Sequence, residues 1–139
     1  SVLEADLTFS RSLPDFSQNQ TVFTLPVSSD GMSLLYDKSV SLNRRTDLLL
    51  PFPLKEHFEY SIEKPANWQL LTGSLEKEVK SSSGRVSVSI QQKGNRIKIR
   101  RQLEITDTLI TPEEYEGFLE LWRLWLTPEY NQLTFIHGL

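Results

Sequence analysis

One stretch of the chain, Ile110 to Trp125, has the pattern of a helix, whereas most of the remaining sequence alternates in the manner of β-strands. Thr111 is a suitable N-cap and Pro112 fits the first helical position. Glu114, three residues after Thr111, completes a capping box. The next proline along the chain should end the helix at about Leu126. These signals predict a mainly β domain with one helix near its C-terminus.

The expected helix carries more apolar surface than packing against one sheet requires. At 100° per residue, one face collects Tyr115, Phe118, Leu119, Trp122 and Leu126. Three further apolar residues, Leu121, Leu124 and Trp125, fall outside this face and widen the apolar arc. Two explanations stay open. The proline-rich segment 51–54 could cover Leu121 and Trp125, or all three side chains could form a docking face for the rest of a longer polypeptide.

The clearest strand signal is a hairpin made of residues 85–92 and 96–105. A two-residue loop, Gly94-Asn95, suits a type II′ turn. In this register three pairs lie opposite one another: Ile90 with Ile99, Val88 with Arg101, and Val86 with Leu103. The hairpin therefore gathers its apolar side chains on one face.

Other segments extend the strand pattern over the rest of the chain. Alternation predicts strands at 3–9, 22–27, 32–36, 58–62, 68–72, 75–80 and 132–137. Segment 48–54 is apolar but is interrupted by Pro51 and Pro53, which places it at a sheet edge or at a crossing between sheets. The expected fold is an antiparallel β-sandwich, immunoglobulin-like in architecture, with one C-terminal helix packed on it and a short final strand.

Length and charge limit the classes of function. With 139 residues the chain is expected to be a single domain, residues 1–139, cut from a longer protein because Ser1 leads at once into a strand pattern. A net charge of −3 argues against nucleic acid as a partner. No apolar run reaches the roughly 20 residues that span a bilayer, so no membrane insertion is expected.

Few residues of this chain could act in catalysis or bind a metal ion. The histidines are His57 and His137, and a strand would place His57 and Glu59 on one face. A metal site needs further ligands at suitable spacing, so we interpret His57 as an exposed strand residue. The chain has no cysteine, no Gly-x-Ser-x-Gly elbow and no glycine-rich phosphate loop. We predict no catalytic residue, cofactor or metal site in this chain.

Three cations alternate along one face of the hairpin: Arg96, Lys98 and Arg100. They could form a strip that binds an anion or an acidic polysaccharide, with Trp68 and Tyr60 stacking on sugar rings. The alternative is a solvated sheet face, balanced by Glu76 and Glu78 if their strand lies alongside, with the two aromatics in the core.

Two blocks of the sequence resemble a known family. One contains Leu48-Leu-Leu-Pro-Phe-Pro-Leu54 and then Glu59-Tyr-Ser-Ile-Glu-Lys-Pro65. The other contains Ile110-Thr-Pro-Glu-Glu-Tyr115 and Phe118. They resemble the C-terminal β domain of unknown function that follows the transglutaminase-like core in large Bacteroidetes proteins. One departure is Ala66-Asn-Trp68 after Pro65, where family members often have Gly-Tyr.

The resemblance implies a non-catalytic accessory domain whose partners are the upstream domains of the same polypeptide. The catalytic residues of the transglutaminase-like core would lie upstream, and none can be carried onto this sequence. A periplasmic or extracellular location is implied by the resemblance only. The alternative function is a carbohydrate-binding β-sandwich module.

Overall fold

The computed structural model describes residues 19–25, 44–50 and 52–137, and the strands expected at 3–9 and 32–36 lie outside these ranges. The described strands are β1 (Gln20–Thr24), β2 (Leu48–Leu49), β3 (Leu54–Glu63), β4 (Gln69–Leu70), β5 (Leu75–Ser81), β6 (Gly84–Lys93), β7 (Arg96–Ile105), β8 (Leu109–Ile110) and β9 (Gln132–Ile136). The helices are α2 (Pro112–Leu126) and the short 3-10 helix η1 (Pro128–Tyr130). The predicted strands that fall within the described ranges appear with shifts of a few residues at their ends.

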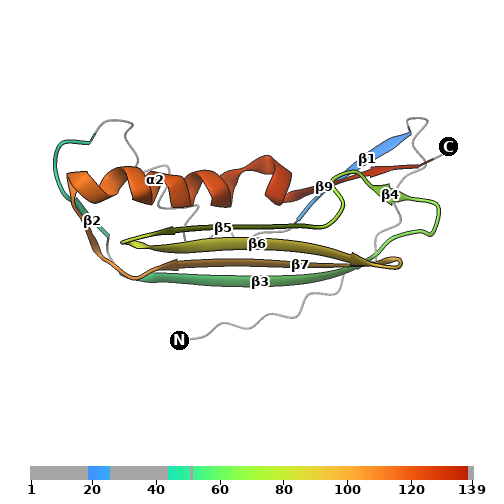
Figure 1. Ribbon diagram of the computed structural model, residues 1–139, viewed down its shortest axis with the longest axis horizontal. Coiled ribbons are helices and arrows are strands. Elements are labelled where there is room, and N and C mark those ends of the chain that lie inside the picture. The colour runs from blue at the N-terminus through green and yellow to red at the C-terminus, as the bar shows by residue number, and fades with distance from the viewer. Residues whose placement is uncertain (1–18, 26–43, 51, 138–139) are drawn as a thin grey trace.

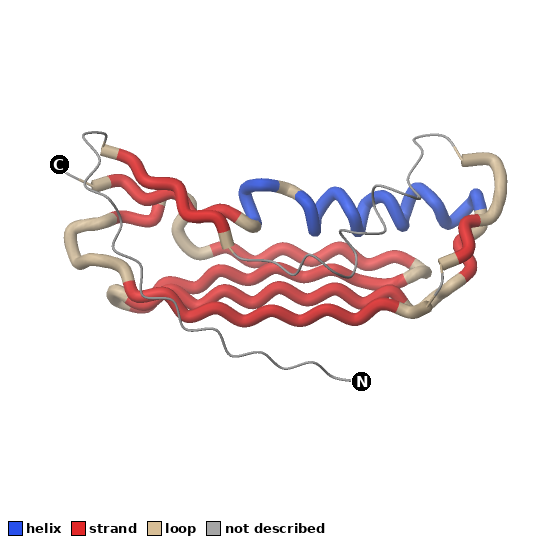
Figure 2. The backbone as a smooth tube through the Cα atoms, turned by 180° about the vertical axis from the view of Figure 1, so that it is seen from behind, coloured by secondary structure: helices blue, strands red, loops and turns tan. Residues whose placement is uncertain are grey.

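The strands form an antiparallel sandwich whose second layer is shared between a helix and a small sheet. The larger sheet has four strands in the order β3-β7-β6-β5, and the smaller sheets have the orders β1-β9-β4 and β2-β8. Helix α2 and the three-stranded sheet lie end to end over the same face of the larger sheet (Figures 1 and 2). The mainly β class with a packed C-terminal helix and a short final strand is confirmed.

The β6–β7 hairpin has the register that the alternation of its residues predicts. Ile90 lies opposite Ile99, and Val88 lies opposite Arg101. Gly94 has a φ of 61°, and no non-glycine residue among those described has a positive φ, as a type II′ turn requires. Because β7 is bonded to β6 on one side and β3 on the other, this hairpin sets the inner and outer faces of the whole sheet.

A close backbone approach occurs where β5 turns into β6. An added Cβ on Gly84 would lie 2.0 Å from the carbonyl oxygen of Glu104, so a side chain at this position cannot fit without moving the backbone. The neighbouring Ser83 carbonyl accepts a hydrogen bond from the Thr106 backbone N–H at 2.9 Å. Glycine is needed here for space rather than for an unusual φ.

Helix α2 begins and ends where its sequence signals predict. The Glu114 carboxylate accepts a hydrogen bond from the Thr111 backbone N–H at 3.3 Å, which is the half of the capping box that glutamate supplies. The side chain of Thr127 donates to the Arg123 carbonyl just after the last turn. Gly117 lies against β5, because a Cβ there would stand 3.0 Å from the Cβ of Ser81.

The inner face of the four-stranded sheet carries two hydrophobic clusters. The helix cluster lies under α2 and joins it to β2, β3, β6, β7 and β8; its buried members include Leu48, Leu50, Leu54, Val86, Leu103, Phe118, Leu121, Trp122 and Trp125. The small-sheet cluster lies under β1, β9 and β4 and includes Leu25, Leu70, Ile90, Ile97, Ile99, Leu133 and Phe135. The outer face of the four-stranded sheet is therefore left to polar side chains.

Candidate functional site

The outer face of the four-stranded sheet carries a hydrogen-bonded network that crosses three strands. Gln102 of β7 lies between Ser87 of β6 and His57 of β3. Ser87 Oγ donates to Gln102 Oε1 at 3.4 Å, and Gln102 Nε2 donates to His57 Nδ1 at 2.9 Å. On the far side of the imidazole, His57 Nε2 lies 3.1 Å from Glu59 Oε1. An amide nitrogen can only donate, so the proton of the neutral imidazole lies on Nε2 and points at Glu59.

Glu59 is the acceptor at the end of this network. The hydrogen bond from His57 lowers the pKa of Glu59 below the ordinary glutamate value, and the charge of Arg100 lowers it further. Arg100 Nε lies 3.2 Å from Glu59 Oε1. Both members of the His57–Glu59 pair are exposed, which confirms the interpretation of His57 as an exposed strand residue. The network orients side chains on an open surface.

The strip of Arg96, Lys98 and Arg100 lies exposed along the outer face of β7, as predicted. Glu76 and Glu78 could balance the strip only if their strand lay alongside β7, and this condition is not met, because β6 separates the two strands. The acidic residues opposite the strip belong to β3 instead. Glu63 lies opposite Arg96 and Glu59 lies opposite Arg100, while Lys98 faces Ser61.

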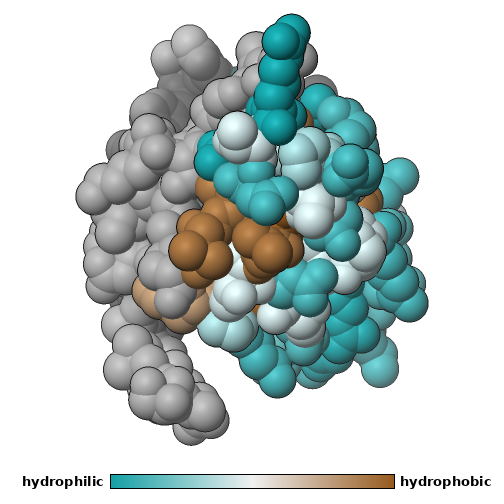
Figure 3. Space-filling model, turned by 90° about the vertical axis from the view of Figure 1, so that its left-hand side faces the viewer, coloured by the Kyte–Doolittle hydropathy of each residue, from teal (hydrophilic) through white to brown (hydrophobic). Residues whose placement is uncertain are grey.

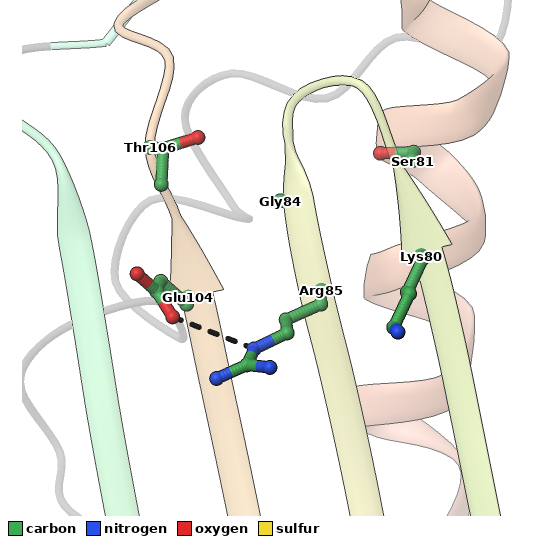
Figure 4. A pocket seen from close by; sticks show the side chains of 6 residues that line it. All are labelled: Lys80, Ser81, Gly84, Arg85, Glu104 and Thr106. Atoms are coloured by element: carbon green, nitrogen blue, oxygen red, sulfur yellow. Dashed lines mark ion pairs between the residues drawn. The ribbon is translucent and has the colours of Figure 1, made fainter.

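A shallow hollow of about 300 Å³ lies at the end of the sheet where β5 turns into β6 (Figure 4). Its lining residues are Lys80, Ser81, Gly84, Arg85, Glu104 and Thr106. Arg85 Nε lies 3.5 Å from Glu104 Oε2, and Lys80 Nζ lies 3.6 Å from Glu78 Oε1. Each cation is already next to a carboxylate and is well solvated, so the hollow has little excess charge for an anion.

The aromatic residues considered for sugar stacking, Trp68 and Tyr60, are partly buried and pack against the small-sheet cluster. The Trp68 ring stacks on His137 with a centroid distance of 4.4 Å and also contacts Phe135. Tyr60 stacks on Phe58 at 6.3 Å, on the inner face of β3. Both rings thus contact the core rather than standing free on the surface, but each keeps a partly exposed edge.

The predicted docking face on the helix is not an exposed surface. Leu121, Leu124 and Trp125 are all buried, so the expectation that they form a free stripe is wrong. The helix cluster contains them together with Leu50 and Leu54, which belong to the apolar segment around the two prolines. The alternative explanation, coverage from within the domain, accounts for the wide apolar arc of α2.

Three of the exposed large apolar residues lie instead at the end of the domain formed by β2 and β8. Leu49 and Leu109 lie directly opposite each other in this two-stranded sheet and are 73% and 49% exposed. Phe52, three residues after Leu49, is 51% exposed. Figure 3 shows hydrophobic surface gathered at this end. We call Leu49, Phe52 and Leu109 the apolar end patch. Sequence reasoning missed it, because alternation in a two-residue strand does not tell which side faces the core.

The described residues offer neither a metal site nor a membrane-spanning helix. Within residues 19–25, 44–50 and 52–137, no three histidine, aspartate or glutamate side chains are placed to hold a metal ion together. None of the helices in that part of the chain combines the length and apolar character needed to cross a bilayer.

This chain matches a protein family and part of a longer protein of known structure. A family model described as a domain of unknown function with a solved structure (DUF3858) matches residues 20–135. Part of the crystal structure of a "putative protease" from Parabacteroides distasonis has the same fold, with a TM-score of 0.77 and 24% sequence identity. The match covers 86% of this chain but 24% of that protein, so this chain spans about a quarter of its length. The curated proteins contain no match.

Proposed function

We propose, from the premise that this chain belongs to the DUF3858 family, that it is a non-catalytic accessory domain of a longer, protease-like protein. The observation that carries the proposal is the unequal coverage of the structural match. The fold takes up 86% of this chain and 24% of the Parabacteroides protein. A domain of this kind contributes packing and shape to its neighbours, while the chemistry is done in the remainder of the polypeptide.

The outer sheet face supports a non-catalytic role. Catalytic groups usually lie in a concave site that limits the access of water, where a histidine can act as a general base. Here His57 lies on an open sheet, and both of its ring nitrogens are engaged, by Gln102 and Glu59. The geometry suits a stabilising surface network better than proton transfer to a substrate.

The finer part of the proposal concerns the neighbouring core. The resemblance of residues 48–65 and 110–118 suggests that a transglutaminase-like core lies upstream and that the protein is exported. Such a core would use an activated cysteine as its nucleophile. This chain contains no cysteine, so a thiol-dependent activity of the longer polypeptide would have to originate outside it.

The proposal is tested by measuring peptide hydrolysis by this chain and by the longer polypeptide that contains it. We expect no turnover by this chain, and turnover by the longer polypeptide that iodoacetamide abolishes. The double variant His57→Ala/Glu59→Gln in the longer polypeptide should keep its rate within about twofold, because both residues lie outside the proposed catalytic core. Turnover by this chain alone, or a loss of about 100-fold or more in the double variant, would contradict an accessory role.

A further inference from the structure

We infer that the apolar end patch is the surface on which a neighbouring domain of the same longer polypeptide docks. The inference rests on the proposed function, because it names the partner of the accessory domain. It places the docking surface on Leu49 of β2, Leu109 of β8 and Phe52, and not on helix α2.

The backbone of β2 and β8 holds the patch in place. Leu48 lies opposite Ile110, and both are buried, so their strands present one side to the helix cluster. The next pair, Leu49 and Leu109, must then point away from the core, because successive side chains alternate across a strand. Opposite side chains in an antiparallel pair lie close enough to touch, so the two leucines form a continuous apolar surface.

The concentration of exposed apolar side chains at one end is the informative feature. Single exposed leucines are normal, whereas exposed apolar side chains that lie side by side, as Leu49 and Leu109 do, mark an interaction surface. Five large apolar side chains are strongly exposed in the part of the chain that the structure describes. Three of them form the apolar end patch; the other two, Val22 and Leu71, lie in or next to the three-stranded sheet at the opposite end (Figure 1).

Charged residues of both signs lie near the patch residues in the sequence. Arg44 donates hydrogen bonds to the carbonyl oxygens of Thr46 and Asp47, which orders the approach to β2. Asp107 precedes β8, and the exposed Glu113 lies in the first turn of α2. An apolar centre with a polar rim is the usual anatomy of a protein interface. The mixed charge favours a protein surface over an anionic membrane or nucleic acid, which would require mainly cations.

The length of the structural match points to a neighbour in the same chain. In the Parabacteroides protein 24% of the chain is covered, which leaves most of that polypeptide available to contact the matched domain. Interfaces between domains of one chain are modest in area and carry polar groups, because the linker supplies a high local concentration. The small apolar end patch with its charged rim fits this type of interface.

Hydroxyl-radical footprinting of the longer polypeptide and of this chain tests the inference. We expect oxidation of Leu49, Phe52 and Leu109 to be several-fold slower in the longer polypeptide, because a neighbour excludes water from them. The double variant Leu49→Glu/Leu109→Glu should restore fast oxidation at Phe52. Its matched control, Val22→Glu/Leu71→Glu, places two charges at equally exposed apolar positions and should leave the protection unchanged. Both double variants should fold in this chain, because the replaced side chains are exposed.

Three results would overturn the inference. The first is equal oxidation of the apolar end patch in both proteins. The second is protection in this chain that grows with its concentration, since the occupant would then be a second copy. The third is equal loss of protection in the control variant. The proposed function fails by a different measurement, because peptide hydrolysis by this chain would refute the accessory role whatever the footprint shows.

Discussion

The guanidinium group of Arg101 lies 4.2 Å from the ring centroid of Trp125, and its Nη2 donates a 2.5 Å hydrogen bond to the carbonyl oxygen of the same residue. That carbonyl belongs to the last turn of α2, where backbone oxygens lack partners within the helix and the helix dipole attracts a cation. Arg101 therefore joins the sheet to the C-terminal end of the helix. It is almost fully buried, and burial lowers the pKa of its guanidinium below the ordinary value.

Replacing Arg101 tests how much the charge of its side chain contributes to the free energy of unfolding. We expect Arg101→Ala to reduce the free energy of unfolding by about 2–4 kcal/mol, because it leaves a cavity and a carbonyl without its partner. Arg101→Met should cost less, since methionine fills the space and removes a buried cation, although it also gives up the interactions of the guanidinium with Tyr60 and Glu56. Urea denaturation of both variants measures the difference. If Met cost as much as Ala, the cation and its hydrogen bond would outweigh the packing.

Gly84 is predicted to be intolerant of any side chain. Gly84→Ala should lower the free energy of unfolding by about 2–3 kcal/mol, because the new Cβ would overlap the Glu104 carbonyl oxygen and force β6 and β7 apart. Gly117→Ala is the matched control. Its Cβ would only press on the side chain of Ser81, and alanine gains helix propensity of about 1 kcal/mol, so the net change should be small. Equal losses in the two variants would contradict the distinction.

The pKa of Glu59 gives a pH-dependent prediction. Its folded-state value is lowered from 4.5, so its contribution to stability is present above pH 4.5 and is lost as the pH falls through the lower, folded-state pKa. His57→Ala should raise the Glu59 pKa toward the ordinary value more than Arg100→Gln does, because the hydrogen bond from His57 is the larger cause. Carboxyl-carbon NMR titration of the two variants measures this order. The reverse order would show that the charge of Arg100 dominates.

His137, which follows β9, is predicted to stabilise the three-stranded sheet β1-β9-β4. Its ring stacks on Trp68, and its Nε2 lies 2.7 Å from Thr21 Oγ1. His137→Ala should cost about 1–2 kcal/mol of unfolding free energy, from the lost stacking and hydrogen bond together. Thr21→Val removes only the hydrogen bond and should cost less. A double-mutant cycle of His137→Ala with Trp68→Leu would show no coupling if the stacked rings contribute nothing.

Local patterns determined the elements and their faces. Alternation placed Ile90 opposite Ile99 and predicted that Arg101 would share the inner face, because side-chain direction in a strand has a period of two. Thr111, Pro112 and the later proline defined the bounds of α2, because caps and proline act on the backbone within one turn. The exposure of His57 followed from the same kind of short-range reasoning.

Only the tertiary structure decided which elements lie next to one another. The order β3-β7-β6-β5 places Glu59 and Glu63, and not Glu76 and Glu78, opposite the cation strip. Likewise, the packing of the segment around Leu50 and Leu54 buries Trp125. The same packing leaves Leu49 and Leu109 exposed to solvent, although they are as apolar as the buried residues and lie only one position from Leu48 and Ile110 in the sequence. Sequence alternation defines the two faces of a strand, but contacts between distant segments determine which face meets the core and which is left for a partner.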